Sequence, residues 1–320
     1  WHERVRRSGA PGEREAMSTS ADFFFGRSMT LFAAAALLAA SPAIHAGTPI
    51  SERAAADPAG SVEVSNVAGT VRVSGWDRSE VEVTGELGDG AEKLEFAVAD
   101  KVTRIKVILP RKAGNVEDTN LVIRVPAASR LSVNTVSADI EVQGLLGAQR
   151  LQSVSADILT AAAGEDVECK SVSGDVAVNG SFKKGLLTIT TVSGDATALR
   201  VAGEVNANTV SGDITLGLGD TNRSRVRSTS GDLTLAALLA ADGRLDAESI
   251  SGDVRLELVG AVNAEFDLSS FNGEIRNCFG PKAVSTSEYA PGKELRFREG
   301  QGTALVRIKT MNGDIDVCRK

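Results

Sequence analysis

The stretch Thr209-Val210-Ser211-Gly212-Asp213-Ile214-Thr215-Leu216 decides how this chain folds, because close copies of it recur through most of the sequence. Successive copies between residues 138 and 273 are 18 to 21 residues apart, and a last copy follows 40 residues later. The Gly position of the copies is occupied by Gly69, Ala138, Ala156, Gly174, Gly194, Gly212, Gly231, Gly252, Gly273 and Gly313. A fixed period near 20 residues is typical of a solenoid, in which one structural unit stacks on the next.

The residues around each Gly, which we number as position 0, predict β-strands. Apolar residues at positions −2, +2 and +4 alternate with polar ones, as in a strand with one buried face. A second apolar column lies at position −5, so the chain must turn a corner between −5 and −2 if both are buried. We therefore expect an all-β fold, a β-solenoid of the single-stranded, right-handed β-helix type with 18–21 residues per coil. The −2 column contains Val67, Val136, Val154, Val172, Val192, Val210, Ile250, Phe271 and Met311.

The Gly itself falls in an inward phase of this pattern, where a side chain would collide with the next wall of the coil. Ala138 and Ala156 replace it twice, which indicates that small size matters at least as much as a left-handed backbone.

The N-terminal region carries the features of an export signal. Arg27 precedes an apolar run from Met29 to Ala40, and small residues follow up to Ala46, which is the pattern of a secretory signal peptide cleaved after Ala43 or Ala46. The run is too short to span a membrane comfortably. We expect the exported protein to be periplasmic, or secreted to the cell surface.

The rest of the chain reads as one domain without an internal linker. Two apolar segments near the C-terminus, Glu294 to Phe297 and Ala304 to Lys309, predict a hairpin around Glu299-Gly300-Gln301-Gly302. The expected organisation is an extension with signal peptide at 1–46, a linker at 47–60, and a β-helix domain at 61–320 with irregular N-terminal coils at 61–132, regular coils at 133–277, and a C-terminal hairpin and last coil at 278–320.

Charge and histidine content exclude several classes of function. His2 and His45 both precede the predicted mature chain, so histidine-based general bases, catalytic triads and zinc sites are unavailable to it. The formal charge of −7 gives no electrostatic reason to bind nucleic acid or anionic lipid. We expect no cofactor, and no integral membrane segment in the mature chain.

Carboxylates at position +1 are the main candidates for chemistry. Three interpretations stay open: the Asp side chains accept hydrogen bonds from turn amides, they form weak cation sites, or two of them act as the acid pair of a glycoside hydrolase. A hydrolase needs two carboxylates in different surroundings, whereas a uniform repeat gives each Asp the same ones. The candidates are Asp139, Asp157, Asp175, Asp195, Asp213, Asp232 and Asp253, continued by Glu274.

Two of the three cysteines occupy matching positions. Cys278 and Cys318 both stand five residues after their Gly, and export would permit a disulfide bond between them. The alternative is two free, buried thiols. Cys169 lies in the −5 column and is expected to be a small buried hydrophobic residue.

The chain resembles the bacterial putative-adhesin family of unknown function over about residues 61–318. The resemblance rests on the signal peptide, the serial Val-Ser-Gly-Asp-Ile units, the early Val71-Arg72-Val73-Ser74-Gly75-Trp76-Asp77 and the closing Asn312-Gly313-Asp314-Ile315. It implies a β-helical protein of the cell envelope and adds little about activity, because a fold hosts many functions.

We expect an exported, non-catalytic β-helical protein that acts as a structural or adhesin-like interaction surface of the cell envelope. Its partner would be an envelope protein or polysaccharide that the sequence does not identify. The alternative is a β-helical polysaccharide-processing enzyme that uses paired Asp carboxylates.

Overall fold

The computed structural model of the chain describes residues 47–111, 116–163, 165–181, 183–287 and 290–320. The predicted signal peptide lies outside the described residues. Every regular element in the described part is a β-strand, so the predicted all-β class is confirmed and no described helix could cross a membrane. The strands are β1 (Thr48–Ala55), β2 (Ser61–Trp76), β3 (Glu80–Leu87), β4 (Lys93–Ala99), β5 (Val102–Ile108), β6 (Thr119–Pro126), β7 (Arg130–Gln143), β8 (Gln149–Gln152), β9 (Ile158–Ala162), β10 (Val167–Lys170), β11 (Val176–Gly180), β12 (Lys184–Thr190), β13 (Ala196–Ser211), β14 (Ile214–Ser230), β15 (Leu233–Ser251), β16 (Val254–Leu258), β17 (Ala264–Asn272), β18 (Ile275–Asn277), β19 (Val284–Ser287), β20 (Ala290–Glu299), β21 (Ala304–Asn312) and β22 (Ile315–Arg319).

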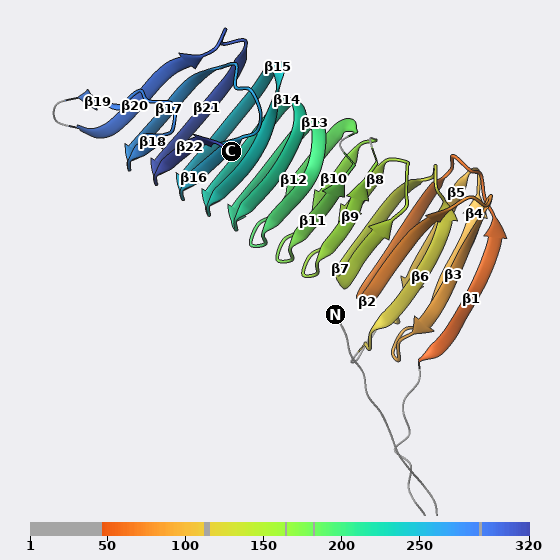
Figure 1. Ribbon diagram of the computed structural model, residues 1–320. Coiled ribbons are helices and arrows are strands. Elements are labelled where there is room, and N and C mark those ends of the chain that lie inside the picture. The colour runs from red at the N-terminus through yellow and green to blue at the C-terminus, as the bar shows by residue number, and fades with distance from the viewer. Residues whose placement is uncertain (1–46, 112–115, 164, 182, 288–289) are drawn as a thin grey trace, which may run out of the picture. The chain divides into compact units, whose positions relative to one another are not determined.

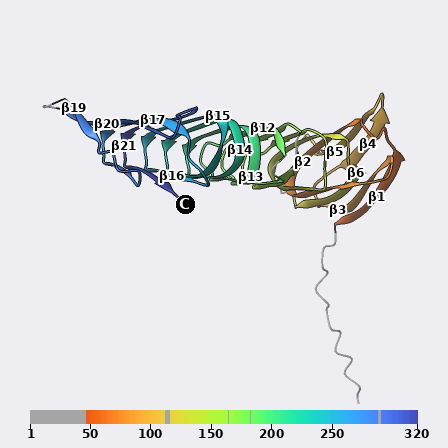
Figure 2. The ribbon, with the colours of Figure 1, turned by 45° about the horizontal axis from the view of Figure 1, so that its top comes forward.

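The strands pair into two walls, which Figure 2 shows one above the other. Wall one has the spatial order β4, β5, β2, β7, β8, β10, β12, β13, β14, β15, β21, β17, β20, β19. Wall two has the order β1, β3, β6, β2, β7, β9, β11, β13, β14, β15, β16, β22, β18. Pairing is parallel from β5 to β17 in wall one and from β6 to β18 in wall two, and antiparallel beyond these strands. Long strands such as β13 belong to both walls because they run from one to the other.

Neighbouring copies of the repeat lie directly above one another, and we call each copy in this stack a layer. In wall one, Cys169 pairs with Leu151 of one adjacent layer and Ile189 of the other. In wall two, Ile214 pairs with Ala196 and Leu233. The −5, +2 and +4 columns are buried in one continuous hydrophobic core, as the alternation predicts.

The −2 column is exposed from Val136 onward and half-buried at Val67, so its predicted burial is wrong. The chain bends at positions −2 and −1, and side chains at both positions point outward. Because two successive residues point outward, the inward positions are −5 and −3 before the bend and 0, +2 and +4 after it. Position −5 is apolar, and position −3 carries small buried hydroxyl residues such as Thr191 and Ser249. The sequence pattern alone placed this change between −5 and −2, which is too early in the chain.

The small residue at position 0 is required by the adjacent layer, and not by the opposite wall as expected. A Cβ added to Gly231 would lie 2.1 Å from the carbonyl oxygen of Gly212, and one added to Gly252 would lie 2.1 Å from that of Gly231. At these glycines the backbones of successive layers thus meet at the corner with no room for a side chain, whereas Ala138 and Ala156 keep a buried methyl group at the same position.

The N-terminal region is more ordered than the predicted linker implies. Residues 48–55 form β1, which pairs antiparallel with β3 along its whole length. The first copy of the repeat, in β2, lies between β5 and β6 on one side and β7 on the other. It is therefore an inner layer, and the strands β1, β3 and β4 cover it together with β5 and β6 (Figure 1).

At the C-terminal end, too, a copy of the repeat lies inside the stack and other strands cover it. The hairpin predicted for this region is wrong. β21 lies between β15 and β17, and β22 lies between β16 and β18 (Figure 1). β20 pairs with β17 on the side away from β21, so β20 and β21 are not neighbours. The last copy of the repeat enters the stack because its backbone matches the layers on both sides, while the antiparallel β20 covers the edge of β17.

Candidate interaction surface

A row of carboxylates runs along the beginning of wall two, directly after the corner. In each layer, the backbone N–H of the acidic residue donates to Oδ1 of the acidic residue in the adjacent layer, with N···O distances of 2.8–3.2 Å. The seven Asp residues expected in this column do lie together, and Asp314 occupies the layer between Asp253 and Glu274. The carboxylate row is, in spatial order, Asp139, Asp157, Asp175, Asp195, Asp213, Asp232, Asp253, Asp314 and Glu274.

These hydrogen bonds give the carboxylates a structural role. Each of the eight Asp carboxylates satisfies a corner amide of the next layer, and a hydrogen bond to an ionised acceptor is stronger than one to a neutral acceptor. The bonds offset the repulsion between carboxylates that stand about 4.8 Å apart, the spacing of neighbouring strands. The described residues contain no group of three or more His, Cys, Asp or Glu side chains placed to hold a metal ion. Weak cation binding by the row therefore stays a prediction.

Replacing Asp213 by Ala should lower the free energy of unfolding by about 1–2 kcal/mol, because it leaves the N–H of Asp232 without its acceptor. Asp213→Asn keeps an oxygen at the same place and removes one charge from the row, so its effect should be smaller. Urea denaturation of both variants measures the difference. Equal losses would mean that the charge matters and the hydrogen bond does not.

Thermal melting with chelator and then with calcium, at matched ionic strength, separates this role from cation binding. We expect the melting temperature to change by less than about one degree, because most ligands of a cation in the row would have to be water. A shift of many degrees that Asp195→Asn/Asp213→Asn abolishes would assign the row to cations instead.

An apolar strip runs along the corner, beside the carboxylate row. The sequence pattern predicts that these residues lie in the core. The strip consists of the side chains at position −2. Their exposed fractions range from 40% at Val192 to 54% at Met311, with Thr229 as the one polar member. Main-chain hydrogen bonds such as Ser193 N–H to Val172 O hold successive members in line. The apolar strip is, in spatial order, Val136, Val154, Val172, Val192, Val210, Thr229, Ile250, Met311 and Phe271.

A groove of about 560 Å³ lies over the outward residues of wall one and contains two further carboxylates, Asp166 and Glu168. A hydrogen bond from Lys170 lowers the pKa of Glu168 the most; burial opposes this effect, and the charges of Lys170 and Arg150 add to it. A glycosidase acid needs a raised pKa to stay protonated near neutral pH. Glu168 is therefore poorly suited to that role.

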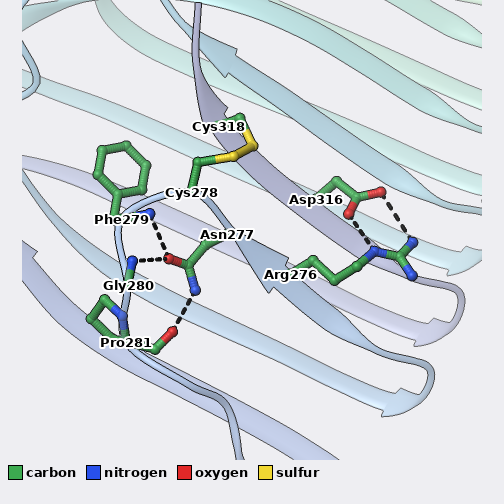
Figure 3. The surroundings of a disulfide bond; sticks show 8 residues. All are labelled: Arg276, Asn277, Cys278, Phe279, Gly280, Pro281, Asp316 and Cys318. Atoms are coloured by element: carbon green, nitrogen blue, oxygen red, sulfur yellow. Dashed lines mark hydrogen bonds and ion pairs between the residues drawn. A yellow bond between two sulfur atoms is a disulfide. The ribbon is translucent and has the colours of Figure 1, made fainter.

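Cys278 and Cys318 are joined by a disulfide bond (Figure 3). Cys278 follows β18 and Cys318 lies in β22, so the bond ties the last strand of wall two to its neighbour. The N–H of Cys278 also donates to the carbonyl oxygen of Val317, at 3.1 Å. Beside it, Oδ1 of Asn277 accepts hydrogen bonds from two backbone amides and Nδ2 donates to the carbonyl oxygen of Pro281. The turn after β18 is thus fixed by side chain and disulfide together.

Removing the disulfide with Cys278→Ser/Cys318→Ser should lower the free energy of unfolding by about 2–4 kcal/mol, because the bond closes a loop between residues 40 apart. Urea denaturation measures the loss, and reduction of the unaltered protein should reproduce it. Intact-mass analysis of non-reduced, exported protein checks the bond itself. Two free thiols at these positions would contradict the pairing.

Cys169 is buried and unpaired in the wall-one core. Burial raises the pKa of its thiol to about 12, with a smaller contribution from the charge of Glu168. A thiol that stays protonated is a poor nucleophile, so Cys169 is a packing residue.

Residues 61–318 match a protein family described as Toastrack DUF4097. The match covers the span over which the sequence resembles the putative-adhesin family, and that resemblance is confirmed. No curated protein sequence matches the chain.

Several solved structures resemble the chain at low sequence identity. A "putative lipid binding protein" from Parabacteroides distasonis is 12% identical and has a TM-score of 0.49, with 85% of this chain and 97% of that chain covered. A "putative adhesin" from the same organism is 14% identical, with a TM-score of 0.42 and coverages of 84% and 97%. A "putative adhesin" from Bacteroides fragilis is 14% identical, with a TM-score of 0.37 and coverages of 84% and 97%. Likenesses this distant carry no functional assignment.

Proposed function

The chain belongs to the Toastrack DUF4097 family, and we propose that it is an exported, non-catalytic β-solenoid of the cell envelope that serves as a structural or adhesin-like interaction surface. The solenoid is a right-handed β-helix in this proposal. Its partner is an envelope protein or polysaccharide.

One observation carries the proposal: the repeat layers are even, and their acidic side chains are used to join them. Parallel pairing continues from layer to layer, as between β13, β14 and β15, with register shifts confined to residues 199–204 of β13 and 218–223 of β14. A stack of such units presents an extended surface on which each layer repeats the features of the last. Surfaces of this kind suit the binding of long or repeated partners.

The same observation argues against the polysaccharide-processing enzyme. The eight Asp of the carboxylate row accept the same hydrogen bond from the next layer, so they do not offer the two unlike carboxylates that an acid and a nucleophile need. At the end of the row, Asp314 and Glu274 pair in addition with Arg276 and Lys293. Asp166 and Glu168 share a groove, but the lowered pKa of Glu168 opposes the role of a general acid.

Export rests on the signal-peptide pattern, and the disulfide bond is compatible with an oxidising compartment. Fractionation of cells that express the full chain, followed with an antibody, tests this part of the proposal. We expect the protein in the periplasmic or surface fraction, and Leu37→Arg/Leu38→Arg, which breaks the apolar run, should retain it in the cytoplasm. Cytoplasmic recovery of the unaltered chain would contradict export.

Incubation of the purified chain with isolated envelope polysaccharide tests the non-catalytic part. We expect no release of reducing ends, and equal retention on the polysaccharide by the unaltered chain and by Asp166→Asn/Glu168→Gln. Release of reducing ends that this double substitution abolishes would support the hydrolase instead.

A further inference from the structure

The apolar strip is the largest feature of the surface that the proposed function leaves unexplained. Eight of its nine members are large apolar side chains, and each exposes two fifths or more of its surface. Together they expose on the order of 500 Å² in one continuous line, at the upper end of what a soluble monomer leaves uncovered, and patches of this size mark interaction sites. The strip also lies outside the core that holds the fold together, so stability does not account for it.

A groove of about 530 Å³ runs beside the strip on the side of wall one. The groove spans four layers, and residues at position −3 such as Ser228 and Ser249, whose hydroxyls point inward, line its floor. Ile250 and Met311 of the strip form one side, and Arg227, Glu248 and Lys309 at position −4 form the other. The surface therefore carries a line of apolar side chains next to a channel that could receive a similar line.

We propose that this surface binds a second copy of the chain, with the strip of each copy lying in the groove of the other. The strip repeats once per layer, at the spacing of about 4.8 Å between strands. A second copy has the same repeat, so the layers of the two copies stay aligned along the contact. The arrangement is a two-fold dimer, in which one surface serves both partners.

Charge selects the direction of the second copy. The carboxylate row borders the strip on one side, and Lys170, Arg227 and Lys309 are exposed at position −4 on the other. A two-fold axis parallel to the stack brings equal layers together and sets the carboxylates of one copy against the −4 side chains of the other. Lys309 then faces Asp314 of the second copy, and Lys170, which also pairs with Glu168 of its own chain, faces Asp175.

The other direction is disfavoured. A two-fold axis across the stack would set carboxylate row against carboxylate row, and like charges at close range repel. Glu248, the one acidic residue at position −4, already pairs with Arg227 at 3.0 Å. An anionic membrane is disfavoured for the same reason, since the carboxylate row would approach it together with the strip.

This inference goes beyond the proposed function, because an envelope location and a binding role neither require nor exclude a dimer. With the flanking rows included, the contact approaches the roughly 800 Å² per partner of a standard interface. An interface of that size dissociates in the micromolar range or below.

Sedimentation velocity of the full chain, from about 1 to about 100 μM, tests the dimer. Val192→Ser/Val210→Ser removes two members of the strip from each copy and should raise the dissociation constant at least about tenfold. Leu159→Ser/Leu199→Ser is the matched control, because both leucines are similarly exposed and lie outside the strip. The control should associate as the unaltered chain does, and all three proteins should melt at the same temperature when diluted to a concentration at which each is a monomer. A chain that stays monomeric throughout, or equal weakening by both substitutions, overturns the proposal.

Carbodiimide cross-linking of a mixture of light and heavy-isotope chains tests the direction. Links between copies should join Lys309 to Asp314 and Lys170 to Asp175. Links between copies from Lys170 to Glu248, both at position −4, would show the opposite direction, and links that all avoid the strip would overturn the interface. Flotation with phosphatidylcholine vesicles tests whether the strip binds a membrane instead of a second copy. If the unaltered chain is a monomer that binds the vesicles, and Val192→Ser/Val210→Ser does not bind them, the strip is a membrane-binding surface and the dimer is overturned.

Discussion

Replacing Ile214 by Asp should lower the free energy of unfolding by about 4 kcal/mol or more, enough to prevent folding of the repeat stack. The Ile214 side chain has no exposed surface, and its neighbours in wall two are Ala196 and Leu233. Neither can pair with a carboxylate, so the substitution buries an unpaired charge or forces the strand to turn over. Circular dichroism and urea denaturation of the purified variant measure the loss.

Thr215→Asp is the matched control, since Thr215 is the next residue and points outward between Thr197 and Thr234. It adds the same charge to the same strand and should change stability by less than about 1 kcal/mol, as exposed substitutions do. If Ile214→Asp melts like the unaltered protein, or Thr215→Asp is the more damaging of the two, the inward and outward assignments in this strand are wrong.

Replacing Gly231 by Ala should lower the free energy of unfolding by about 3–5 kcal/mol, from a steric clash together with an unfavourable backbone conformation. The new Cβ would stand 2.1 Å from the carbonyl oxygen of Gly212 and 2.7 Å from its carbonyl carbon, and φ at Gly231 is +150°. Both contacts are with backbone that is itself held between layers, so neither side can yield without breaking main-chain hydrogen bonds.

Gly217→Ala separates this effect from the general cost of losing a glycine. A Cβ at Gly217 would meet the end of the Leu199 side chain at 3.3 Å, which can shift. We expect a change within about 1 kcal/mol of zero, and of either sign, because Ala also restricts the unfolded chain. Urea denaturation of the two variants side by side decides the matter: equal losses would mean that the close approach of layers at the corner is not the reason for glycine there.

The sequence predicts the buried columns of the repeat well, because they depend on local alternation. Positions −5, +2 and +4 are apolar in nearly every copy, and a strand with one buried face needs only that pattern. The alignment of the Asp residues follows from the same period. Their hydrogen bonds do not, because the partner of each carboxylate is an amide in another layer and not in its own turn.

The strip at position −2 shows where alternation fails. Val192 and Val210 have the residue type and spacing of core residues, yet they are exposed. The prediction assumed that outward and inward positions alternate without interruption up to the Gly. The bend at −2 and −1 breaks that rule, and nothing in the residue types of Val and Ser marks the residue at which it occurs.

The order of the layers is a second property that only the tertiary structure decides. The copy in β2 lies between β6 and β7, and the last copy, in β21 and β22, lies ahead of β17 and β18. Copies of one repeat present nearly identical edges, so local pairing energies do not distinguish one neighbour from another. The strands that cover the ends, including β1 in the segment expected as a linker, select the order by leaving no unpaired edge inside the stack.

By itself the sequence determined that this protein is all-β, that it repeats every 18–21 residues, and which columns form its core. These properties follow from periods within one copy, where neighbours in sequence are neighbours in space. The tertiary structure decided the exposure of the apolar strip, the bonding of the carboxylate row and the positions of the first and last copies. Each of these depends on contacts between copies, and the interactions between nearly identical units are set by geometry that no single unit encodes.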